Sequence, residues 1–172
     1  MSELPNIRVP EAVDAWRMVA AQREFEGRFA LAAMPRLRDS LLDPEGDARY
    51  VLAFGTDALK LPYVELRIEA ELPLECQRSL QRFLLPVRVE QRLGLVRDEA
   101  DEAALPPDYE ALLVGADGML KPAELVEDEL ILALPVVPVS PEAEAVERDF
   151  APTDAETAQA NPFAALAGLK KE

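Results

Sequence analysis

The most regular pattern in this chain is the alternation of apolar and polar residues between Glu65 and Arg92. Apolar residues occupy every second position from Val64 to Cys76, and charged residues fill most of the positions between them. The same alternation resumes at Phe83. Because a period of two is typical of a strand with one buried and one exposed face, this stretch predicts two long β-strands.

The same alternation also predicts the register in which the two strands pair. If the chain reverses between Arg78 and Ser79, residues whose numbers sum to 157 face each other, and apolar residues meet apolar ones. The exposed pairs are then Glu75 with Arg82, Glu69 with Arg88, Arg67 with Glu90 and Glu65 with Arg92. A shift of one residue would place apolar residues opposite charged ones. Each exposed pair contributes only about 0.2–1 kcal/mol, so the buried face supplies most of the stability.

Shorter patterns predict further elements around this hairpin. Alternation predicts strands at 25–31, 50–54 and 110–114, whereas helical spacing predicts helices at 10–23, 35–42 and 122–134. Trp16 lies on the apolar stripe of the first helix, where we expect it to anchor the core. The predicted fold class is α+β: an antiparallel sheet, open or curled toward an open barrel, centred on the hairpin at 65–92 and covered by helices.

Changes in composition predict how the chain is divided. We expect residues 1–139 to form a single α+β domain, with a mobile acidic loop near 95–108 that has too little apolar surface to offset its ordering entropy. Residues 140–172 are acidic and rich in Ala, Pro and Thr. We expect them to form a disordered tail that ends in a short motif at 161–171.

Composition excludes several kinds of chemistry. The 172 residues include no histidine and one cysteine, which excludes Ser–His and Cys–His nucleophiles, His-ligated zinc and an intramolecular disulfide framework. We find neither a signal peptide nor an apolar run of membrane-spanning length, since Pro135 and Pro138 interrupt the most apolar segment. We therefore expect a reduced, cytoplasmic protein without membrane contacts.

The net charge of −15 is unevenly distributed. Residues 1–92 carry 13 basic and 15 acidic side chains, whereas residues 93–172 carry 5 and 18. The first part contains most of the arginines and could face a polyanion, whereas the second part would repel one and suits a basic protein partner. An acidic tail that only confers solubility is the alternative interpretation.

The predicted helix at 122–134 carries several acidic residues. Glu124 and Asp128, four residues apart, could in principle hold a divalent cation, but we favour a solvated acidic face, which explains both residues without any metal. A carboxylate–metal nuclease built on Glu124, Glu127 and Asp128 is disfavoured, because two-metal chemistry needs carboxylates from several elements. We therefore predict no catalysis, no cofactor and no metal.

Three segments carry a resemblance to a known family: LECQR at 74–78, VEDELILALPVVPV at 126–139 and NPFAALAGLKK at 161–171. Their combination and order resemble the bacterial YceD family, long classed as a domain of unknown function. The resemblance implies a role in accumulation of large-subunit ribosomal RNA. Relatives are implicated in this process in bacteria and chloroplasts, and their genes commonly lie beside that of a large-subunit ribosomal protein.

The chain departs from its relatives at one position. Many relatives carry CxxC, but here the second position is Ser79, and no later cysteine follows. A structural zinc site or a redox pair therefore cannot form within this chain. We expect Cys76 to act as a small buried hydrophobic residue.

Two kinds of binding site follow from these observations. Gln77, Arg78 and Arg82 at the hairpin tip could contact phosphates of large-subunit rRNA, although paired glutamates would neutralise Arg82, Arg88 and Arg92. Stacking aromatic residues are scarce, since only Phe83 is nearby and it belongs to the buried face. Alternatively, Phe163, Leu166 and Leu169 could dock on a basic ribosomal protein or an rRNA-processing enzyme, and the RNA would be reached through that protein.

Overall fold

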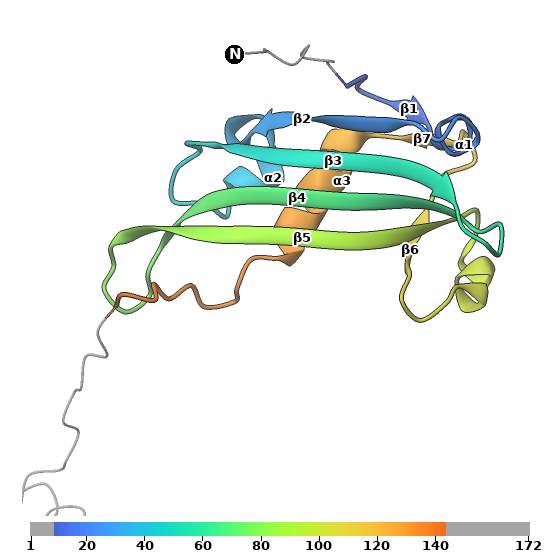
Figure 1. The fold of residues 1–172 in the computed structure, drawn as a ribbon. Helices are drawn as coiled ribbons and strands as arrows, with labels where there is room; N and C mark the ends of the chain where they lie inside the picture. The colour runs from blue at the N-terminus through green and yellow to red at the C-terminus, as the bar shows by residue number, and fades with distance from the viewer. Residues whose placement is uncertain (1–8, 144–172) are drawn as a thin grey trace, which may run out of the picture.

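The computed structural model describes residues 9–143 and shows a mixed sheet with helices on one face (Figure 1). Five strands lie in the order β2 (Glu24–Ala30), β3 (Asp47–Thr56), β4 (Pro62–Glu75), β5 (Arg82–Val96) and β6 (Glu110–Leu113). All neighbours are antiparallel except β5 and β6, which are parallel. The predicted α+β class is confirmed, and the sheet stays open rather than closing into a barrel.

The register predicted for the long hairpin is confirmed throughout. β4 pairs with β5 so that Glu75 lies opposite Arg82, Leu74 opposite Phe83, Ala70 opposite Val87 and Glu65 opposite Arg92. The even-numbered residues of β4, from Val64 to Leu74, are buried. Their burial on one face is what the period of two requires.

Helix α3 (Pro122–Leu132) covers the buried face, crossing behind β3, β4 and β5 in Figure 1. Leu125, Val126 and Leu130 point into the core, and each contributes roughly 1.5–3 kcal/mol by leaving water. Helix α2 (Pro35–Arg38) packs beside α3 on the same side. The opposite side of the sheet carries no helix among the described residues, and we call it the open face.

The N-terminal helix is shorter than its apolar spacing predicts. α1 (Ala15–Ala20) begins after Asp14, whose side chain accepts a hydrogen bond from the Arg17 N–H at 3.0 Å. Residues 13–14 instead form strand β1 (Val13–Asp14), which pairs with β7 (Met119–Leu120). Trp16 packs against the core but remains partly exposed, and the Arg97 guanidinium lies 4.3 Å from its ring centroid.

Two connecting segments also differ from the prediction. Helix α2 ends at Arg38, and a 3₁₀-helix, η1 (Leu31–Ala33), precedes it. β5 continues to Val96, and residues 99–104 form a second 3₁₀-helix, η2 (Glu99–Ala104), whose first N–H groups bond to Asp98. The segment 95–108 therefore contains regular structure. Its mobility and the division between 139 and 140 remain predictions.

The acidic side of α3 is only partly a solvated face, because Glu124 and Asp128 are exposed but Glu127 is not. Glu127 is only 4% exposed. One of its carboxylate oxygens accepts the backbone N–H groups of Arg36 and Leu37 at 2.7 and 3.1 Å, and the other accepts from the Arg36 guanidinium. Because the first N–H groups of a helix lack partners within it, Glu127 caps α2 across the interface between the two helices.

A second acidic residue of α3, Glu129, is also buried. Its exposure is 7%, and no side-chain hydrogen bond to it is found within residues 9–143. Burial raises the pKa of Glu129 above its ordinary value, and the charges of Glu110 and Asp128 raise it further. Folding therefore favours the protonated, neutral form of this carboxyl group relative to the unfolded chain.

We expect Glu127→Ala to destabilise the protein by about 3 kcal/mol, because the substitution leaves two N–H groups and the Arg36 charge without their buried acceptor. Chemical denaturation would measure this loss. Asp128→Ala is the matched control, since Asp128 is half exposed and bonds only to Arg36. A loss no greater for Glu127→Ala than for Asp128→Ala would contradict the capping role.

We expect Glu129→Gln to raise the melting temperature at pH 7–8. In the wild type the raised pKa means that the contribution of Glu129 to stability is fully present at low pH and is lost as the pH rises through that pKa, where the carboxyl group ionises. Glutamine has the same shape and no charge to desolvate. The difference should vanish below about pH 4, where carboxyl groups are protonated in both states. Thermal unfolding of both proteins between pH 3.5 and 8 would test this, and parallel curves would refute it.

Candidate functional site

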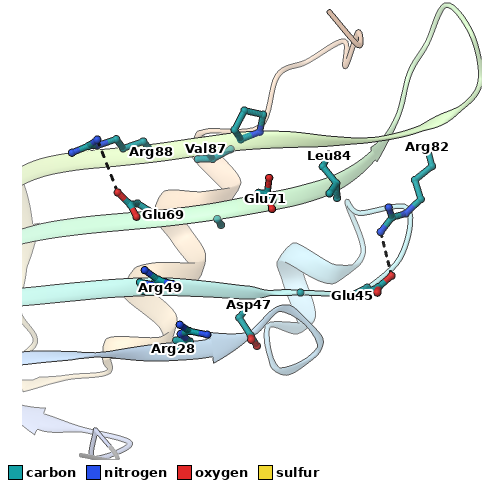
Figure 2. Close-up of a pocket in the computed structure, with 13 residues that line it drawn as sticks. Arg28, Glu45, Asp47, Arg49, Glu69, Glu71, Arg82, Leu84, Val87 and Arg88 are labelled. Atoms are coloured by element: carbon teal, nitrogen blue, oxygen red, sulfur yellow. Dashed lines mark hydrogen bonds and ion pairs between the residues drawn. The ribbon is translucent and has the colours of Figure 1, made fainter. Parts of the chain in front are cut away.

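The open face of the sheet carries a row of charged residues, one from each of four neighbouring strands. Arg28 of β2 lies opposite Arg49 of β3, Arg49 lies opposite Glu69 of β4, and Glu69 lies opposite Arg88 of β5. The alternation that buries the neighbouring positions turns these four side chains toward solvent. We call Arg28, Arg49, Glu69 and Arg88 the arginine row (Figure 2).

Arg28 and Arg49 are the unusual members of this row. They are directly opposed in an antiparallel pair, and neither forms an ion pair with a carboxylate of residues 9–143. Like charges in such positions destabilise a sheet. Figure 2 shows the two side chains next to each other over β2 and β3. Two adjacent guanidinium groups without a carboxylate partner can receive an anion such as a phosphate.

The arginine row borders a hollow of about 680 Å³ on the open face. The hollow extends from the row toward the hairpin tip, where acidic side chains join its lining: Glu45, Asp47 and Glu71. Arg82 and Arg88 of β5 also line the hollow, but both form ion pairs with carboxylates. The lining arginines without an ion pair among the described residues are therefore those over β2 and β3. An extended anion would have to enter from that side.

Arg88 and Arg82 are already engaged by carboxylates. Arg88 bonds to Glu90 at 2.7 Å and lies 4.0 Å from Glu69, and these interactions raise its pKa. Arg82 bonds to Asp43 at 2.7 Å and lies 3.3 Å from Glu45. The hydrogen bond to Asp43 is the main reason that the pKa of Arg82 is raised.

The predicted ion pairs are only partly correct, although the register is right. Glu65 pairs with Arg92 at 3.4 Å and Glu69 with Arg88, as expected. Arg82 reaches the β2–β3 connection instead of Glu75, and Arg67 pairs with Glu65 instead of Glu90. Long arginine side chains reach carboxylates beyond the residue directly opposite, which the register alone does not specify.

At the hairpin tip, the side chains of Gln77 and Arg78 are both exposed. Arg78 forms no ion pair within the described residues, and it is the backbone N–H of Gln77 that donates to the Pro138 carbonyl at 2.9 Å. Arg82 is held by Asp43 and Glu45. RNA contacts by these three residues remain a prediction. Phe163, Leu166 and Leu169 lie outside the described residues, so their docking role also remains a prediction.

Sequence reasoning did not identify Arg28 and Arg49. The alternation around Phe25 and Tyr50 indicates that both arginines lie on an exposed face. It does not show that they are opposite each other, because residues 31–46 separate β2 from β3 and no short turn determines the register.

Cys76 is buried, as expected, but it is not a simple hydrophobic residue. Its sulfur accepts the Ser140 N–H at 3.3 Å. Hydrogen bonds from the Ser79 side chain, the Ser79 backbone and the Ser140 backbone lower its pKa to about 7, against the effect of burial. The thiol therefore helps to join residues 138–140 to the hairpin tip.

The acidic residues considered for metal binding are held by cations of the protein. Glu124 bonds to Lys121 at 2.8 Å, while Glu127 and Asp128 bond to Arg36. Across residues 9–143, no three Cys, Asp or Glu side chains are grouped so that they could hold a metal ion. In the same part of the chain, no helix is long and apolar enough to cross a membrane.

Comparison with known proteins identifies relatives in sequence. The model of the family described as "Large ribosomal RNA subunit accumulation protein YceD" matches residues 64–170. A protein of Haemophilus influenzae with the same name is 32% identical over 176 residues, which cover 98% of this chain and 100% of that protein. No solved structure matches the chain.

We expect Arg28→Glu to stabilise the sheet by about 0.5 kcal/mol, because it replaces a like-charged pair opposite Arg49 with an oppositely charged one. Urea denaturation at low salt would measure the gain, which should shrink as the salt concentration rises. Arg23→Glu makes the same change in net charge outside the strands. Equal effects of the two substitutions would show that the opposed arginines do not repel each other.

Proposed function

The chain belongs to the YceD family, and we propose that it acts without catalysis in ribosome biogenesis in the cytoplasm, supporting the synthesis, processing or stability of large-subunit (23S) rRNA. We further propose that it contacts this RNA directly through Arg28 and Arg49. Membership of the family supports the role in ribosome biogenesis, and the arginines of the open face support the direct contact with RNA.

The observation that carries the contact is the opposition of Arg28 and Arg49 without a carboxylate partner among the described residues. The repulsion between them costs stability in the free protein. A phosphate bound between the two guanidinium groups would remove that cost and accept charge-assisted hydrogen bonds from both. Arg78 at the hairpin tip would add a further phosphate contact.

The net charge of −15 limits how the protein binds RNA. Long-range repulsion opposes non-specific binding, so the attraction must come from the few arginines at the contact. Two phosphate contacts to single-stranded RNA predict a slope of about −1.4 when the logarithm of the binding constant is plotted against that of the salt concentration. The binding would therefore be weak and local.

The acidic surface favours a second candidate, a protein-interaction module that reaches rRNA through a partner. Glu99, Asp101 and Glu102 are exposed on η2, next to the sheet end that carries β6. Such a surface suits a basic ribosomal protein or an rRNA-processing enzyme. Phe163, Leu166 and Leu169 would supply the apolar contacts.

The proposed function is tested by the ratio of large- to small-subunit rRNA in cells depleted of the protein. We expect a selective fall of this ratio, which the wild-type protein restores. The double variant Arg28→Gln/Arg49→Gln should fail to restore it, and the fold should remain stable because the substitution removes the like-charged pair without placing a new carboxylate opposite Glu69. Arg23→Gln/Arg38→Gln is the control, because it changes the net charge equally outside the strands.

Two further variants separate the candidates. Failure of Arg78→Glu/Arg82→Glu would extend the RNA contact to the hairpin tip, whereas failure only on deletion of residues 161–172 would favour the protein-interaction module. An unchanged rRNA ratio on depletion would contradict the proposed process itself.

A further inference from the structure

A cluster of two tyrosines and an arginine lies at the other end of the open face. The Arg92 guanidinium is 4.9 Å from the centroid of the Tyr63 ring and 5.8 Å from that of Tyr109. The two rings meet edge to face, with their centroids 6.4 Å apart. Sequence reasoning missed both tyrosines. Tyr63 lies just outside the predicted hairpin at 65–92, although the same register continues to it and places it opposite Gly94, two residues from Arg92. Tyr109 comes from a separate connection and reaches the sheet only in the folded protein.

Glycines on both neighbouring strands explain how the tyrosines lie. Tyr63 of β4 is opposite Gly55 of β3 and Gly94 of β5. A Cβ atom at Gly55 would be 2.8 Å from the Tyr63 hydroxyl oxygen and 2.9 Å from its ring. A Cβ atom at Gly94 would be 2.6 Å from Leu105 and 3.2 Å from the Tyr109 ring. Tyr63 therefore lies over the bare backbone of Gly55, whereas Leu105 and Tyr109 together cover Gly94.

Tyr109 and Arg92 have different positions in the cluster. The Tyr109 hydroxyl donates to Asp57 at 2.9 Å, which ties the connection before β6 to the end of β3. The Arg92 side chain is 42% exposed, with one ion pair to Glu65 at 3.4 Å. Tyr109 thus supports the cluster, whereas solvent reaches the half-buried Tyr63 and the exposed Arg92, whose guanidinium lies over the Tyr63 ring.

The cluster and the arginine row share one side of the sheet. Tyr63 and Glu69 are both odd-numbered residues of β4, and the even-numbered residues between them are buried. Six residues of strand separate them by about 20 Å. An RNA strand that follows β4 could place phosphates at Arg28 and Arg49 and an unpaired base at the cluster.

We infer that Tyr63 and Arg92, supported by Tyr109, form a stacking site for an unpaired base of single-stranded RNA. Proteins that bind single strands combine cationic contacts to phosphates with aromatic rings or guanidinium planes on which bases stack. The inference rests on the proposed RNA contact and adds the chemistry that distinguishes a nucleic acid from other polyanions. The stacking site predicts that the protein prefers unpaired regions of RNA, since a base within a duplex is already stacked on its neighbours and cannot stack on Tyr63.

The inference is tested with the full chain and two fluorescent probes, a ten-residue oligouridine and a strand of the same length that carries phosphates but no bases. We expect the wild type to bind oligouridine roughly tenfold more tightly than the abasic strand. Tyr63→Leu should bring oligouridine binding down to the abasic level, while Tyr63→Phe keeps the preference. Arg92→Lys retains the positive charge but lacks the planar guanidinium group. It should also weaken the preference for oligouridine over the abasic strand.

The result separates the inference from the proposed function. Arg28→Glu should weaken the binding of both strands equally, because it removes a phosphate contact that does not depend on bases. Equal binding of both strands by the wild type, or an undiminished preference in a folded Tyr63→Leu variant, would overturn the stacking site but leave the phosphate contact standing. Binding of neither strand would overturn both.

Discussion

The fold depends on the pairing of β4 with β5 in a single register. This register places a mainly apolar face, interrupted only by Gln91 along β4 and β5, against α3 and puts the charged residues on the other side. A slip of one residue would bury a row of charges and expose the core, which costs far more than any single pair contributes. The pairing of β4 with β5 therefore determines both which side chains form the core and which side chains form the candidate site.

Two features of the open face reduce the stability of the free protein. Arg28 and Arg49 repel each other in the free protein. Gly55 and Gly94 have no side chain, which leaves room above the backbone for Tyr63 and Tyr109. Neither feature is needed to bury the core, since both lie on the side away from α3. Their joint presence on one surface is what an extended anionic polymer with flat bases would require.

The acidic residues of this protein serve different purposes that charge alone does not reveal. Glu127 caps α2, Asp43 engages Arg82, and Asp57 holds the Tyr109 hydroxyl. Each pairing joins segments that are distant in sequence. The negative charge of the described part is therefore partly structural, which reduces how much of it remains for a basic partner or a metal ion.

The sequence by itself determined the α+β class, the strands of the hairpin and their register, because period-two alternation is a local pattern and only the short connection 76–81 separates the two strands. Only the tertiary structure decided which arginines lack a partner, that Glu127 is buried, and that Tyr109 meets Tyr63. These features join residues across long connections, where loop length and side-chain reach leave many pairings open. The final arrangement of charges and aromatic rings is selected by how the helices and connections pack around the sheet.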